Sequence, residues 1–158
     1  MMQPKPLHIL ISPLDWGLGH ASRCIPLIRH LANSGHRITL AGSGRSLKML
    51  QIEFPNLKSI VVPGFSPTYS RSGNTILHLF LSIPGFLKSM VSEHCALRNI
   101  LNTEHIDIVI SDNRYGFRHK SVKSILITHQ VMIKTPGWLR FAEYPLYRLS
   151  RLLISRFD

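Results

Sequence analysis

Short apolar runs alternate along this chain with segments of helical periodicity. The first run, residues 8–12, lies between Pro6 and Pro13 and fits a buried strand. Apolar residues then recur at helical spacing from Ile25 to Ala32, and Asn33-Ser34-Gly35 is a helix stop. Further strands are predicted at 37–41, 58–62, 107–111 and 124–128, and helices at 46–52, 75–102 (interrupted at Pro84-Gly85) and within 136–158. This alternation predicts an α/β, Rossmann-like parallel sheet with helices on both faces.

The length and composition fit one folded domain. The chain has 158 residues, of which 44% are hydrophobic, so it can bury a core and is not disordered throughout. We find no repeat or linker and expect a single domain over residues 1–158. Cys24 and Cys95 have no metal-binding or redox spacing, which favours a reducing, cytoplasmic compartment. No stretch approaches the roughly 20 uninterrupted apolar residues of a membrane-spanning helix.

The charge balance favours anionic partners. Nineteen Lys and Arg against eight Asp and Glu give a net charge of +11, which suits phosphates, nucleic acid or a membrane surface. The basic and aromatic stretch 114–120 would serve a nucleic-acid-binding module, although it matches no full motif. The apolar run 76–87 is either core or a lipid-contacting patch. The basic, aromatic tail 136–158 would lie on an anionic membrane or pack against a further domain.

Three segments follow strands at the same edge of the predicted sheet. They are residues 13–22, 112–118 and 129–137. Ligands of open parallel sheets bind beyond the carboxyl ends of the strands, so we expect these segments to converge on one site.

The first of these segments carries the most informative turn. Gly17 and Gly19 let the backbone approach a ligand, and the helix that follows points N–H groups at the turn, as in anion sites. Ser22 occupies the third position of the dinucleotide G-x-G-x-x-G pattern, and residues 41–43 supply no acid for a ribose. A nucleotide- or dinucleotide-binding domain therefore remains an alternative, as does a simple tight joint between strand and helix.

His20 lies at the start of this helix. The positive end of the helix dipole disfavours an imidazolium there. A neutral imidazole can take a proton from a hydroxyl, so His20 is a candidate base. The alternative is a surface histidine that caps the turn.

Gly17-Leu18-Gly19-His20, followed by a helix and then by Ser34-Gly35-His36-Arg37-Ile38, resembles the opening of GT-B glycosyltransferases. The closest resemblance is to glycosyltransferase family 28, which includes the N-acetylglucosaminyltransferase of lipid-linked peptidoglycan synthesis. Residues 107–112 and 127–130 match that family more loosely. The resemblance implies one half of a GT-B fold, namely an acceptor-binding domain without its nucleotide-sugar domain.

The resemblance also implies the chemistry. An inverting enzyme would move a sugar, such as N-acetylglucosamine, from a nucleotide-sugar to a hydroxyl of a glycan or lipid-linked acceptor. His20 would be the base, with Asp15 as a second candidate base or as the group that orients the histidine. The expected acceptor- or phosphate-binding residues are Gly17, Leu18, Gly19, Asp112, Asn113, Tyr115, His129 and Gln130.

The resemblance implies no cofactor, with UDP-N-acetylglucosamine or a similar nucleotide-sugar as donor substrate. The chain has no Asp-x-Asp pair, so we expect no metal. A hexosyl or N-acetylhexosaminyl transferase of the cell envelope would act in the cytoplasm or peripherally at the inner face of the membrane. We expect no nucleic acid as partner, and the chain alone to be inactive as an incomplete fragment.

Overall fold

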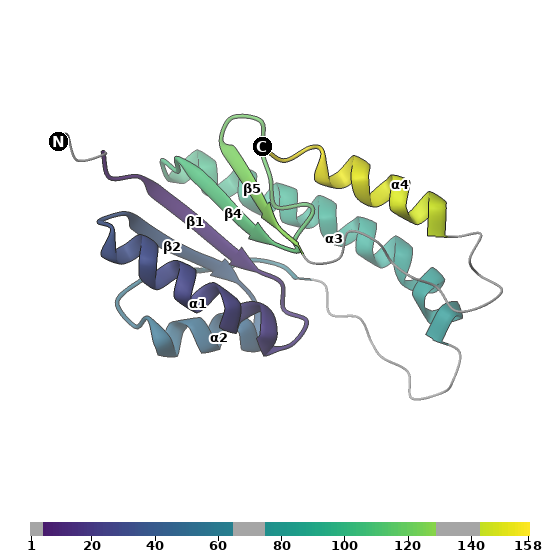
Figure 1. Cartoon of the computed structure of the whole chain (residues 1–158), viewed down its shortest axis with the longest axis horizontal. Helices are drawn as coiled ribbons and strands as arrows, with labels where there is room; N and C mark the ends of the chain where they lie inside the picture. The colour runs from purple at the N-terminus through teal and green to yellow at the C-terminus, as the bar shows by residue number, and fades with distance from the viewer. Residues whose placement is uncertain (1–4, 65–74, 129–142) are drawn as a thin grey trace.

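A computed structural model describes residues 5–64, 75–128 and 143–158; for residues 75–83 it describes the backbone only. Five parallel strands form one sheet in the order β3-β2-β1-β4-β5 (Figure 1). The elements in chain order are β1 His8–Pro13, α1 Leu18–Asn33, β2 Arg37–Gly42, α2 Gly44–Glu53, β3 Lys58–Val61, α3 Thr75–Thr103, β4 Ile108–Asp112, β5 Lys123–Ile127 and α4 Glu143–Ile154. The predicted parallel α/β architecture is confirmed.

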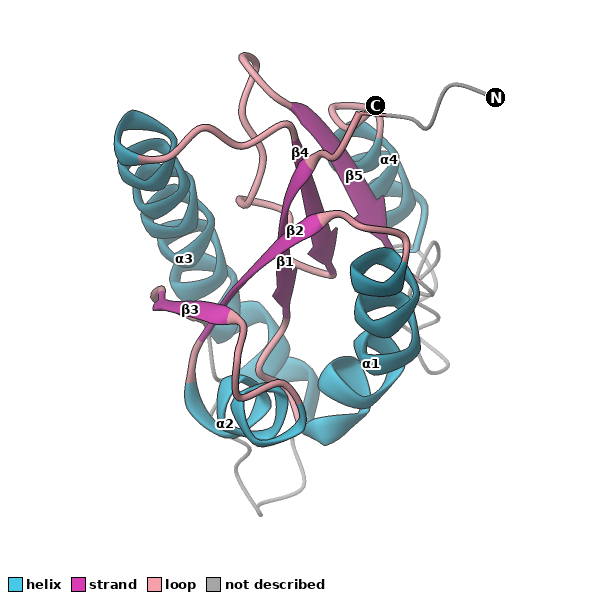
Figure 2. Cartoon of the chain, turned by 90° about the vertical axis from the view of Figure 1, so that its left-hand side faces the viewer, coloured by secondary structure: helices cyan, strands magenta, loops and turns pink. Residues whose placement is uncertain are grey.

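Helices cover both faces of the sheet. Figure 2 shows α3 on one side and α1 with α2 on the other. On the α1 side, Ile9, Ile11 and Ile110 pack with Ile28 of α1. On the α3 side, the alternate strand residues Leu10 and Val109 pack with Leu97 and Ile100 of α3, among others. The central strands β1 and β4 are apolar on both faces, as expected of strands buried in a parallel sheet.

Two prolines lie inside helices without ending them. The sequence predicts a break at Pro84-Gly85, but α3 runs through both residues, so this prediction is wrong. Pro26 likewise lies within α1. It is on the exposed side of that helix, where the carbonyl that proline leaves without a donor can bind water.

The chain changes direction across the sheet at β1. The α1 crossover leads to β2 on one side of β1, and α3 carries the chain to β4 on the other side (Figure 1). The carboxyl ends of β1 and β4 are in register, with Pro13 beside Asp112. Ligand sites of open parallel sheets form at such a reversal of strand order.

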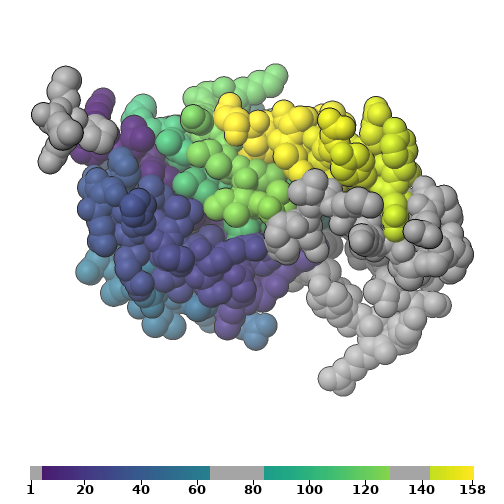
Figure 3. Space-filling model, viewed as in Figure 1, coloured from purple at the N-terminus to yellow at the C-terminus, as the bar shows by residue number. Residues whose placement is uncertain are grey.

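The last helix has no fully buried residue. Tyr144, Leu149 and Leu152 of α4 are exposed, and its residues form part of the visible surface in Figure 3. The chain then returns to β5, where the Asp158 carboxylate accepts a hydrogen bond from the Ser124 backbone N–H at 2.7 Å. Within the described residues, no helix has the length and apolarity needed to span a bilayer.

Candidate functional site at the carboxyl ends of β1 and β4

The turn after β1 delivers His20 to the edge of the sheet. Gly17 precedes α1 with φ 95°, a conformation that residues with a side chain rarely adopt. The helix begins at Leu18, so His20 lies in its first turn. The Leu14 backbone N–H donates to the Asp112 carbonyl at 3.0 Å, which ties the turn to the end of β4.

His20 faces a buried carboxylate. Its Nδ1 lies 3.0 Å from Oδ2 of Asp112, the last residue of β4. The Asp112 side chain is fully buried, whereas that of His20 is 12% exposed. A carboxylate only accepts hydrogen bonds, so this bond requires the proton on Nδ1. Nε2 is then the ring nitrogen that can accept a proton, which is the arrangement of a general base.

Arg23 joins His20 and Asp112 to form a group of three contacting side chains, the His20 cluster. Its Nε donates to Asp112 Oδ2 at 2.8 Å and its Nη2 donates to Oδ1 at 2.7 Å. The two bonds form the fork geometry that arginine and carboxylate share. The guanidinium also contacts His20 Nδ1. Because His20 and Arg23 are three residues apart on α1, they share one face of the helix.

Cys24 closes the buried side of the cluster. Its Sγ lies 4.0 Å from Asp112 Oδ2. Burial raises the pKa of the thiol to about 12, the Asp112 charge raises it further, and Arg23 opposes the shift. Cys24 is therefore a protonated thiol at neutral pH and not a nucleophile.

Asp15 has a different partner from the one expected. Its Oδ1 accepts a hydrogen bond from the Ser46 backbone N–H at 3.0 Å, at the start of α2. A Cβ on residue 44 would lie 1.8 Å from Asp15 Oδ2, so Gly44 makes room for this contact. The carboxylate hydrogen-bonded to His20 is thus Asp112, while Asp15 stabilises the start of α2.

Asn113 and Arg114 follow Asp112, and Arg114 contacts α3 on the other face of the sheet. Asn113 adopts φ 56° and is buried. Arg114 donates from Nε to Glu93 Oε1 of α3 at 3.1 Å, and both side chains are almost fully buried. Burial lowers the pKa of Arg114 and raises that of Glu93, against the attraction between the two charges. This pair holds α3 to the end of β4.

The remaining predicted site residues lie at the start of α1, against α3, or outside the described residues. Leu18 is exposed at the start of α1, and Gly19 has nothing within 4 Å of where a Cβ would be. Tyr115 is half-buried and makes an edge-to-face contact with Phe86 of α3, with ring centroids 6.2 Å apart. The structure thus brings His20 and Asp112 together, while His129 and Gln130 fall outside the described residues.

Arg23 is not among the residues that the sequence motifs indicate. Its spacing of three residues from His20 is the one sequence signal that places it on the same helical face. The partner of both residues was not, because Asp112 is 92 positions from His20 in the sequence.

The basic stretch 114–120 is not a continuous exposed surface. Arg114 is 1% exposed and Phe117 is fully buried, with the guanidinium carbon 5.2 Å from the centre of the phenyl ring. These two residues belong to the interior, which counts against the nucleic-acid-binding alternative.

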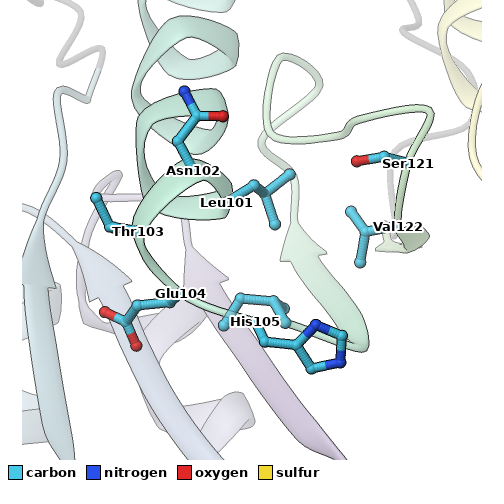
Figure 4. Close-up of a pocket in the computed structure, with 8 residues that line it drawn as sticks. Leu101, Asn102, Thr103, Glu104, His105, Ser121 and Val122 are labelled. Carbon is cyan, nitrogen blue, oxygen red and sulfur yellow. The ribbon is translucent and has the colours of Figure 1, made fainter.

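A pocket of about 350 Å³ lies at the opposite edge of the sheet (Figure 4). The last turn of α3 and the loop leading into β5 line it, with Glu104 and His105 on one side and Ser121 on the other. It is therefore separate from the His20 cluster. In the described part of the chain, no three His, Cys, Asp or Glu side chains gather as metal ligands would.

The sequence matches no protein-family model and no curated protein. Several solved structures share its fold. The glycotransferase of kitacinnamycin aligns with a TM-score of 0.62 and 22% identity, over 98% of this chain and 40% of that one. The calicheamicin glycosyltransferase CalG4 aligns with a TM-score of 0.59 and 16% identity, over 92% and 37%. The fold is that of one half of a GT-B enzyme.

The same fold also occurs elsewhere. The C-terminal domain of the PF1911 hydrogenase from Pyrococcus furiosus aligns with a TM-score of 0.51 and 13% identity, over 78% of this chain and 95% of that one. The chain spans 40% and 37% of the lengths of these two glycosyltransferases. At these identities the likeness concerns the fold, so the function must be argued from the site.

Proposed function

We propose that this chain is the acceptor-binding half of an inverting glycosyltransferase, with His20 as the general base. The observation that carries the proposal is the 3.0 Å contact between His20 Nδ1 and Asp112 Oδ2 at the reversal point of the sheet. The resemblance of residues 17–20 to the glycosyltransferase motif and the fold shared with two glycosyltransferases support it.

In this mechanism His20 Nε2 accepts the proton of an acceptor hydroxyl. The hydroxyl oxygen forms a bond to the anomeric carbon of the donor sugar as the bond from that carbon to the diphosphate breaks. The nucleoside diphosphate leaves with the bonding electrons, and the configuration at the anomeric carbon inverts. Asp112 keeps the imidazole oriented through Nδ1, and the positive end of α1 favours negative charge near Gly17.

The acceptor is a hydroxyl of a glycan or of a lipid-linked molecule. The donor is a nucleotide-sugar, and the resemblance to family 28 supports N-acetylglucosamine as the sugar transferred. A second domain would hold the nucleotide, so we place only acceptor recognition and the base in this chain.

Binding measured by NMR on the isolated chain tests acceptor recognition. We would titrate it with hydroxylated glycans and lipid-linked sugars, and separately with UDP-N-acetylglucosamine and NAD. Acceptors should shift the backbone amides of residues 17–20 and 112–113, and the His20→Gln variant should weaken the effect. If NAD or the nucleotide-sugar shifts these amides and no acceptor does, the chain is a nucleotide-binding domain instead.

A further inference from the structure

The Asp112 carboxylate has two possible counter-ions. Its side chain is fully buried, and it accepts hydrogen bonds from His20 on one side and from Arg23 on the other. A buried carboxylate is costly unless a positive charge accompanies it. One cation is enough to balance it, so at most one of the two neighbours needs to be charged.

Arg23 is the neighbour that supplies this charge. A guanidinium stays protonated at any physiological pH, and Arg23 reaches both oxygens of Asp112, at 2.8 and 2.7 Å. Cys24 adds no charge, because its thiol pKa is raised to about 12. The ring contacts the charged groups of Asp112 from β4 and Arg23 from α1, and the Cys24 thiol lies beside the Asp112 carboxylate, with Sγ 4.0 Å from Oδ2.

We propose that Arg23 is a positioning residue that acts as the permanent counter-ion of Asp112 and thereby leaves His20 an uncharged proton acceptor. The inference rests on the proposed function, because it assigns Arg23 the role of keeping the base, His20, able to accept a proton. Without Arg23, Asp112 would draw a proton onto the imidazole. A doubly protonated ring has no lone pair with which to accept another proton.

The guanidinium also restricts the ring. Nδ1 cannot donate to Asp112 and accept from Arg23 at the same time, since a ring nitrogen either carries a proton or offers a lone pair. Nη2 has a second N–H besides the one that it donates to Asp112 Oδ1, and it also contacts Nδ1. A lone pair on Nδ1 would face the Asp112 carboxylate oxygen 3.0 Å away, so we expect Nδ1 to carry the proton. The geometry thus couples the placement of the charge to the choice of tautomer.

The test is a pH titration of the ¹⁵N-labelled chain, in which the ring nitrogen shifts of His20 are followed and assigned with the His20→Gln variant. The variants are Arg23→Met, which removes the charge, and Arg23→Lys, which keeps it. Arg29→Met is the matched control, because Arg29 lies on the same helix but pairs with Glu53 on the surface.

In the unchanged chain His20 should be neutral at pH 7, with its proton on Nδ1. The Arg23→Met variant should raise the pH of half-protonation of His20 by about one unit or more, as expected when an adjacent cation is lost. Arg23→Lys, which keeps the charge, should show little of this shift, and Arg29→Met should leave the titration unchanged.

A charged His20 at pH 7 in the unchanged chain would overturn the proposal, even if Arg23→Met failed to fold. An unchanged titration in a folded Arg23→Met variant would overturn it as well, while leaving acceptor binding and the role of His20 to their own test. Conversely, the predicted shift together with no acceptor binding would refute the proposed function and preserve the charge relationship.

Discussion

Glu93 of α3 and Arg114, two residues after β4, form an ion pair on the face of the sheet opposite His20. The side chain of Arg114 is fully buried and that of Glu93 is 4% exposed, with 3.1 Å between Nε and Oε1. The two partners respond differently when the other one is removed. A carboxyl group can take up a proton and become neutral, whereas a guanidinium cannot lose one.

Glu93→Gln should therefore be the more damaging of two substitutions in this pair. It removes the carboxylate that Arg114 contacts and leaves the guanidinium buried without a paired charge, a loss of about 3–5 kcal/mol in unfolding free energy. Arg114→Met leaves Glu93, whose pKa burial already raises. Such a carboxyl binds its proton more tightly when folded, so the Arg114→Met variant should gain stability as pH falls through the folded pKa. Urea unfolding between pH 5 and 8 measures both effects, and equal losses at every pH would contradict this account.

Asp107 should give the chain part of its sensitivity to acid. Its Oδ2 accepts a hydrogen bond from the His8 backbone N–H at 2.7 Å, and this bond is the main cause of a lowered pKa. The stabilisation is present above the ordinary aspartate pKa of about 3.9 and is lost as pH falls through the lower, folded value. Urea midpoints measured from pH 5 to pH 2 should fall less steeply in Asp107→Asn than in the unchanged chain. Glu53→Gln, at a surface pair, is the control that should keep the steep fall.

The two cysteines should differ in reactivity. Cys24 is buried with a pKa of about 12, and Cys95 is exposed. A thiol reagent at pH 8 should therefore modify one cysteine per folded chain and both in denaturant, because only the thiolate reacts. Cys95→Ser should abolish labelling of the folded chain. Rapid labelling of that variant would show that Cys24 is accessible to the reagent and would contradict its buried position beside the His20 cluster.

Gly116 should be intolerant of even a methyl group. A Cβ there would lie 2.2 Å from the carbonyl oxygen of Met90 in α3, with other backbone atoms of the same residue nearly as close. Gly116→Ala should therefore cost about 1–3 kcal/mol in thermal or urea unfolding. The matched control is Gly19→Ala within α1, where nothing lies within 4 Å; alanine there should be neutral or stabilising by up to about 1 kcal/mol. Similar losses at both positions would refute the packing argument.

His20→Ala should lower kcat for sugar transfer by about 10²–10⁴-fold in an enzyme that joins this chain to a nucleotide-sugar domain. Asp112→Asn should lower it too, since the amide no longer holds the required tautomer. Arg29→Met is the control that should leave kcat unchanged. A loss with Asp15→Asn and none with His20→Ala would transfer the role of base to Asp15.

The order of the elements could be predicted because each one carries a local signal. The apolar run 8–12 predicts a strand and the periodic apolar residues 25–32 predict a helix without knowledge of the rest of the chain. The structure has β1 and α1 over these residues. The sequence places the start of α1 near His20, about two residues late, because Gly17 precedes the helix without a side-chain cap to mark it. It also predicts a break at Pro84 through which α3 in fact continues, since a proline indicates a break more often than a bend.

The partners within the site could be predicted only in part. His20 and Asp112 were both expected at the carboxyl edge, and the structure places them there. Whether Asp15 or Asp112 contacts the imidazole depends on the path of the turn after β1 relative to β4 and α2. Asp15 accepts a hydrogen bond from the Ser46 backbone N–H at the start of α2. This partner is determined by three-dimensional packing and not by spacing in the sequence.

The separation of 92 residues between His20 and Asp112 has a consequence for how the molecule matures. During synthesis, the first strand, its helix and the second strand emerge while the imidazole still has no acidic neighbour from β4. The contact between His20 and Asp112 can therefore form only after β4 has joined β1, which makes it a late step in the folding of the nascent chain.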